Sequence, residues 1–184
     1  MKERKLKEDY RLETRIDPRT GREKRVPVYQ GIWFSLPPEY PRREALAWAW
    51  GSGLGFAVLL LGYLFFGDRG TYVLYVLLPA ICALMPLAYW MSGAFTLLRS
   101  REKMTRLQRE TGPERVLHSA AGCLILSGMA ALGESIRLLV TGRWAAELLS
   151  LSLLAGAAIA ALMAVRFFSR LSRALDRQMP TTHE

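Results

Sequence analysis

Four charged side chains around one short turn are the residues of this sequence that could carry out chemistry. Glu134 and Arg137 stand three residues apart near the end of one apolar segment, and Arg143 and Glu147 stand four apart near the start of the next. Helical spacing places each pair on one helix face, and a short turn between the segments would bring all four together. Ionisable residues inside apolar segments of membrane-spanning length are the usual candidates for function.

Two interpretations of this polar cluster stay open. In the first, it is a solvated set of ion pairs that caps the turn, contributes ~0–1 kcal/mol and needs no function. In the second, Glu134 turns inward and forms a polar gate or a partner contact with Arg137, because an unpaired carboxylate inside an apolar segment is costly.

The motifs of known catalytic chemistry are missing from the sequence. It contains no Gly-rich phosphate loop, no HExxH and no nucleophile elbow. Its two cysteines, Cys82 and Cys123, lie in the middle of apolar segments, and its two histidines do not complete a ligand spacing for a metal. We therefore predict no catalytic residue, no cofactor and no metal site, and a protein that is not an enzyme.

Four long apolar segments must position the polar cluster, and each exceeds the ~20 residues that a helix needs to cross a bilayer. They are residues 45–66, 72–98, 116–139 and 144–168. We predict an all-α integral membrane protein whose membrane domain, residues 44–168, folds as two antiparallel helical hairpins. The second segment has 27 residues without a charge, and Pro79 and Pro86 give it places to bend. Gly112-Pro113 predicts a break in the chain before the third segment.

The distribution of Lys and Arg predicts an orientation. Of the 25 Lys and Arg residues, 21 lie in residues 1–44, 99–115 and 169–184, whereas the two short turns on the other side carry Arg69 and Arg143. Basic segments stay in the cytoplasm during insertion, so both termini and the loop 99–115 are predicted to be cytoplasmic, at the cell membrane and against anionic lipid headgroups. The first apolar segment begins too late for a cleaved signal peptide. This segregation of charge favours a membrane over a nucleic-acid partner.

The cytoplasmic N-terminal segment, residues 1–43, carries a candidate β-hairpin over residues 10–29. Apolar and polar residues alternate strictly from Tyr10 to Ile16, Pro18 and Gly21 suit a turn, and residues 22–29 suit a return strand. A disordered basic tail is the alternative. Residues 169–184 are predicted to be a second basic cytoplasmic segment.

Small residues and aromatic residues predict how the helices pack and where they meet the membrane surface. Small residues at every fourth position allow close helix packing in lipid, and aromatic rings near a span end lie at the headgroup level. The predicted packing residues are Gly51, Gly55, Ser119, Cys123, Ser127, Ala131, Ser152, Gly156, Ala160 and Ala164. The predicted interfacial anchors are Trp33, Phe34, Trp48 and Trp50. We expect the stripe on 116–139 to face the stripe on 144–168, or a neighbouring copy.

These observations favour an accessory or assembly subunit of a larger membrane complex, with a protein partner or self-association. The alternative is a small homo-oligomeric transporter or channel whose path uses the bend in 72–98 and the Glu134 cluster. An intramembrane enzyme ranks third.

Overall fold

The computed structural model describes residues 10–16, 23–66, 73–100, 103–142 and 144–177. The chain is mostly helical, and four of its described helices are long and apolar enough to cross a membrane. These helical segments cover Arg42–Phe66, Leu74–Arg99, Arg106–Thr141 and Glu147–Asp176. The prediction of four apolar helices of membrane-spanning length is confirmed.

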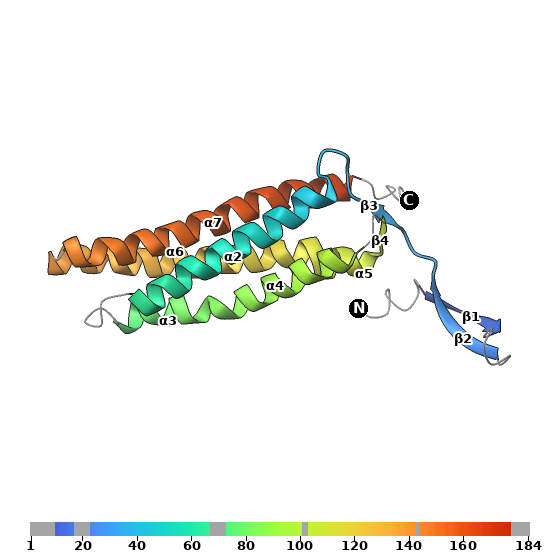
Figure 1. Ribbon diagram of the computed structural model, residues 1–184, viewed down its shortest axis with the longest axis horizontal. Helices are drawn as coiled ribbons and strands as arrows, with labels where there is room; N and C mark the ends of the chain where they lie inside the picture. Colours follow the sequence, from blue (N-terminus) through green and yellow to red (C-terminus); the bar gives the residue numbers. More distant parts are fainter. Residues whose placement is uncertain (1–9, 17–22, 67–72, 101–102, 143, 178–184) are drawn as a thin grey trace, which may run out of the picture.

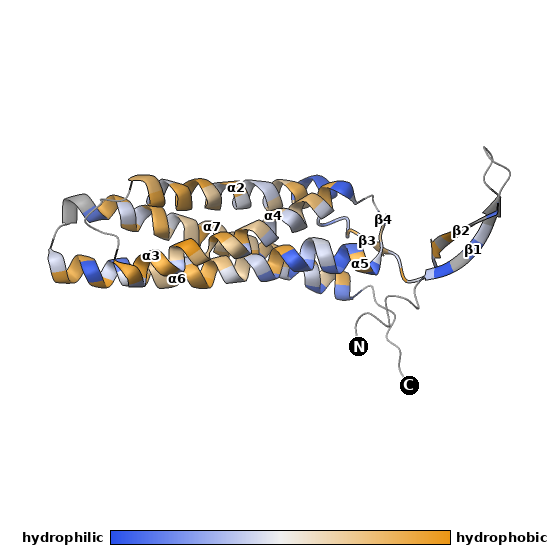
Figure 2. Ribbon diagram, turned by 90° about the horizontal axis from the view of Figure 1, so that it is seen from below, coloured by the Kyte–Doolittle hydropathy of each residue, from blue (hydrophilic) through white to orange (hydrophobic). Residues whose placement is uncertain are grey.

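The helical segments divide into elements that share one long axis in Figure 1. They are α2 (Arg42–Phe66), α3 (Leu74–Cys82), α4 (Leu84–Arg99), α5 (Arg106–Arg109), the π-helix η2 (Glu110–Glu114), α6 (Arg115–Thr141) and α7 (Trp144–Asp176). We call the end where α5 and the end of α7 lie the basic end, and the end where α6 gives way to α7 the opposite end. Figure 2 shows hydrophobic residues along the helices and hydrophilic residues gathered at the basic end.

The helices form a ring of contacts around a filled core. Helix α7 packs against both α6 and α2, and α4 packs against both α6 and α2. Side chains fill the space between them, and the largest that are fully buried include Trp90, Tyr63, Phe56 and Phe168. The indole N–H of Trp90 donates to the carbonyl of Ala49 at 3.1 Å, which ties α4 to α2 through a buried hydrogen bond.

The second apolar segment breaks where its prolines predict. Helix α3 ends at Cys82 and α4 begins at Leu84, with Pro79 inside α3 and Pro86 in the first turn of α4. Because Pro86 has no N–H, the carbonyl of Cys82 has no helical donor four residues on, and the helix bends there. The bend is also a contact point, since the carbonyl of Ala83 accepts a weak hydrogen bond from Cys123 Sγ at 3.8 Å.

The predicted break at Gly112-Pro113 is wrong, because a helix runs through it. The chain is helical from Arg106 to Thr141, and Gly112 and Pro113 lie buried inside η2. A π-helix pairs each carbonyl with the N–H five residues on. The carbonyl of Arg109 is therefore offered the N–H of Glu114 in place of the one that Pro113 lacks. Most of the predicted basic loop 99–115 is helical as a result.

The strands predicted within residues 10–29 are formed. Strand β1 (Tyr10–Ile16) pairs antiparallel with β2 (Glu23–Tyr29), with Tyr10 opposite Tyr29. This hairpin projects away from the helices at the basic end in Figure 1. A second antiparallel pair joins β3 (Phe34–Ser35) to β4 (Lys103–Met104), so the chain before α2 is pinned to the chain after α4.

Candidate functional site

The predicted polar cluster is assembled at the opposite end by one guanidinium group. Arg137 Nη2 donates to Glu147 Oε1 at 2.8 Å, and Arg137 Nη1 lies 3.8 Å from Glu134 Oε2. The hydroxyl of Thr141 lies 3.0 Å from each Glu147 carboxylate oxygen. Three of the four predicted residues thus come together, and Arg143 lies outside the described residues.

The turn after α6 explains how Glu147 reaches Arg137. Gly142 has φ +66°, a left-handed conformation that glycine adopts without a Cβ clash, and its N–H donates to the carbonyl of Leu138 at 3.0 Å. The helix therefore ends abruptly and α7 starts beside it. Glu147, in the first turn of α7, then lies over the face of α6 that carries Glu134 and Arg137.

The interpretation of the cluster as a solvated cap is wrong, because the helices bury it. Glu134 and Glu147 are 0% exposed and Arg137 is 7% exposed. Neither carboxylate oxygen of Glu134 has a hydrogen-bond partner among the described residues. A buried acceptor without a donor is costly, so Glu134 is the least satisfied of the three described groups in this cluster.

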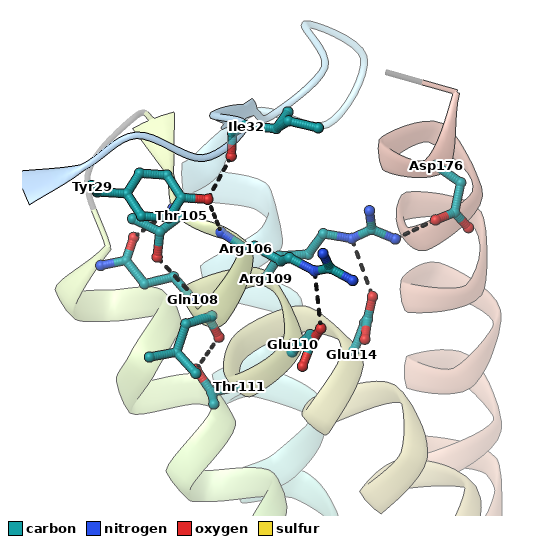
Figure 3. A network of polar contacts seen from close by, with 11 residues as sticks. Tyr29, Ile32, Thr105, Arg106, Gln108, Arg109, Glu110, Thr111, Glu114 and Asp176 are labelled. Atoms are coloured by element: carbon teal, nitrogen blue, oxygen red, sulfur yellow. Dashed lines mark hydrogen bonds and ion pairs between the residues drawn. The ribbon is translucent and has the colours of Figure 1, made fainter. Parts of the chain in front are cut away.

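A second polar site, which the sequence did not reveal, lies at the basic end around Arg109. This side chain is 5% exposed although it carries a full charge. Its guanidinium group lies 4.9 Å from the ring centre of Phe34, pairs with Glu114 at 3.1 Å, and forms an ion pair with Asp176 at the end of α7 (Figure 3). Arg109 therefore clamps the first turn of the third helical segment to the end of α7.

The base of the β1–β2 hairpin is attached beside this clamp. The hydroxyl of Tyr29 donates to the carbonyl of Ile32 at 2.9 Å and accepts from the backbone N–H of Arg106 at 3.1 Å (Figure 3). A capping box of Thr105 and Gln108 starts α5 at the same place. The hairpin therefore projects from a fixed base.

No protein-family model, curated protein or solved structure matches this chain.

The predicted small-residue stripes do not face each other along their length. On α6, Cys123 is buried against the α3–α4 bend. On α7, Ser152 is exposed, and a Cβ on Gly156 would meet Leu59 of α2 at 3.3 Å. The remaining predicted packing residues on these helices are buried (Ser119, Ser127, Ala164) or half-buried (Ala131, Ala160). The buried face of α7 instead follows Leu154, Ala157, Ala161, Ala164, Phe168 and Leu171.

The Gly51–Gly55 spacing does not mark a contact within the described chain. A Cβ at either position would have no described neighbour within 4 Å. Gly53 between them is the close approach, because a Cβ there would meet Trp90 Nε1 at 3.2 Å.

Three of the four predicted anchors keep an exposed surface. Trp33 is 52% exposed. Trp48 and Trp50 are half-buried against Phe167 and Phe95, respectively. The prediction for Phe34 is wrong, because its ring is 2% exposed beneath Arg109.

Within the described ranges, no group of three His, Cys, Asp or Glu side chains could hold a metal ion. The described side chains form two ion-pair clusters, each around a buried arginine: Arg137 at the opposite end and Arg109 at the basic end.

Proposed function

We propose that this chain is a multi-pass protein of the cell membrane that serves as an accessory or assembly subunit of a larger complex. Its four apolar helices cross the bilayer as two antiparallel hairpins, with the basic end and both termini in the cytoplasm. The segregation of 21 of 25 Lys and Arg residues supports this orientation.

Cysteine labelling tests the orientation. In a chain whose own cysteines are replaced by serine, a cysteine at Thr105 should be protected from a membrane-impermeant thiol reagent in intact cells. A cysteine at Gly70, between α2 and α3 in the sequence, should react. Labelling at Thr105 from outside would refute the orientation.

The observation that carries the subunit role is the projecting β1–β2 hairpin. In the described chain this sheet has two strands, so each strand has one edge that no other described strand covers, and a strand of another chain could pair there. Its base carries a cluster of rings, in which Tyr29 contacts Tyr10 at 5.2 Å and Trp33 at 5.0 Å between centroids. A two-stranded ribbon is marginal alone, and a partner strand or apolar surface would stabilise it.

Native mass spectrometry of the gently solubilised protein tests the subunit role. We expect a second protein in fixed stoichiometry, and we expect Trp33→Ala to release it. Tyr89→Ala is the matched control, because Tyr89 is a similarly exposed aromatic residue (58%) on α4. A chain that is always isolated alone, or that loses its partner equally in both variants, would refute the role.

A homo-oligomeric transporter or channel is the second candidate, and buried Glu134 favours it. A carboxylate with no hydrogen-bond donor inside apolar helices is typical of a group that exchanges protons or meets a solute. In this case Glu134→Gln, which keeps the side-chain shape, abolishes solute binding or oligomer formation while expression stays normal. Glu110→Gln at the basic end is the control, and full function in Glu134→Gln would exclude this candidate.

A further inference from the structure

Two adjoining hollows lie where the start of α2 meets the last turns of α7, at the basic end. The larger has a volume of about 390 Å³ and the smaller about 160 Å³. Tyr40 and Arg170 line both, so the two hollows lie side by side and are treated together as one groove. We call it the α2–α7 groove.

The apolar half of the groove has a wall of stacked rings. Phe167 stacks on Trp48 with 5.3 Å between centroids and an interplanar angle of 21°. Tyr40 packs edge-on against the same Phe167 ring at 5.7 Å, and the Tyr40 N–H donates to the carbonyl of Pro37. Met163, one turn deeper on α7, is 49% exposed and extends this wall along the outside of the helices.

The other half of the groove is basic. Arg166, Arg170, Arg173 and Arg177 recur every three or four residues, so they share one face of α7, and all four are exposed. None of them forms an ion pair with another described residue, whereas Glu39 and Glu44 line the groove without neutralising it. The groove therefore carries an excess of two positive charges.

The order of these features along α7 selects the chemistry of the ligand. The distance from Met163 to Arg177 is about 21 Å at 1.5 Å per residue, with apolar surface at one end and guanidinium groups at the other. Guanidinium groups bind phosphate through paired hydrogen bonds, and an apolar wall suits an acyl chain. Basic pockets at the cytoplasmic side of membrane helices hold anionic headgroups in this way.

We propose that the α2–α7 groove is a binding site for an anionic phospholipid. Its phosphate lies between Arg166 and Arg170, and its acyl chains run over Trp48, Phe167 and Met163. The inference rests on the proposed insertion into a bilayer, which alkaline carbonate extraction of membranes checks separately. If the chain is washed off by carbonate, the proposed function fails; if the chain stays but binds no lipid, this inference alone fails.

The test measures lipid bound to the purified full chain by native mass spectrometry after incubation with vesicles. Dioleoylphosphatidylglycerol vesicles supply the anionic lipid, dioleoylphosphatidylcholine vesicles the neutral lipid, and inorganic phosphate the free anion. We expect retention of phosphatidylglycerol. The Arg166→Gln, Arg170→Gln double variant should bind it at least about tenfold more weakly, because each change removes a charge-assisted hydrogen bond.

Two further variants keep this result interpretable. Arg99→Gln removes an exposed charge from α4 at the same end, and it should leave binding within about twofold because it lies outside the groove. The double Arg→Lys variant keeps the charge, so it should fold and bind phosphatidylglycerol more tightly than the double Gln variant. Equal losses in Arg99→Gln and the double Gln variant would overturn the site in favour of diffuse surface charge. Binding of inorganic phosphate as tight as that of phosphatidylglycerol would overturn a lipid ligand.

Discussion

Replacing Gly93 with alanine should destabilise the protein because this glycine lets α4 approach η2. A Cβ at Gly93 would lie 2.9 Å from Val116 Cγ2, 3.1 Å from the carbonyl oxygen of Gly112 and 3.2 Å from the backbone nitrogen of Val116. Two of these three atoms belong to the backbone and cannot rotate away. The matched control is Gly55→Ala on α2, where a Cβ would have no described neighbour within 4 Å.

The comparison between the two variants isolates the cost of packing. Both substitutions replace a helical glycine with alanine, so the change in helix propensity cancels between them. Overfilling a packed site costs roughly 1–3 kcal/mol. A chain of this size changes its Tm by about 2–4 °C per kcal/mol, so we expect Gly93→Ala to melt about 2–12 °C below Gly55→Ala.

The assay is thermal unfolding of the purified full chain in detergent, followed by tryptophan fluorescence. Adding Val116→Ala to Gly93→Ala removes the contact with Cγ2 but leaves the contact with the carbonyl of Gly112, so recovery should be partial. Equal Tm values for Gly93→Ala and Gly55→Ala would refute the reasoning. Full recovery in the double variant would refute the role of the η2 backbone.

Three further predictions concern the two ends of the molecule. Glu147→Gln should lower the free energy of unfolding by roughly 3–5 kcal/mol, because it removes the charged partner that Arg137 Nη2 meets at 2.8 Å. A Tm that falls by less than about 2 °C would contradict this. Arg109→Gln should release the end of α7 from its ion pair with Asp176, seen as faster hydrogen exchange confined to the last turns of α7, and unchanged exchange there would show that the clamp is unimportant. A peptide of residues 1–40 should be largely unstructured in water, and a well-dispersed NMR spectrum would show that the hairpin needs no cover.

The apolar helices could be predicted because their signal is local. Each is a long run of apolar residues, and the bend between Pro79 and Pro86 follows from the missing N–H groups of proline. The strands β1 and β2 were predictable for the same reason, since alternation with period two is read from neighbouring residues.

The contacts between helices were harder to predict because spacing shows which residues share a face but not which helix they meet. The small residues at every fourth position predicted that Gly156 faces α6 or a neighbouring copy, whereas a Cβ there would meet Leu59 of α2. The buried face of α7 follows larger residues such as Leu154 and Phe168, which fill more of the core.

The burial of charged side chains was predicted as one of two interpretations at Glu134 and was not predicted at Arg109, because charge usually indicates exposure. Arg109 was placed in a solvated basic loop, and its burial depends on Phe34 and Asp176, which lie far away in sequence. Glu134 was correctly grouped with Arg137 and Glu147, but its burial depends on the left-handed turn at Gly142 and could not be derived from spacing alone.

The π-helix η2 also sets the angle by which α5, which precedes it, is rotated about the helix axis relative to α6, which follows it. A π turn holds one residue more than an α turn, and each residue corresponds to a rotation of about 100°. Deleting Thr111 would remove this extra residue and turn α5 by about that angle relative to α6, and Pro113 would then leave one carbonyl of the α-helix without its donor. Arg109 would then rotate away from Phe34 and Asp176. The backbone N–H of Arg106, which donates to the hydroxyl of Tyr29, would rotate with α5. The extra residue of the π turn thus sets the angle of α5, to which the base of the hairpin is attached through Tyr29.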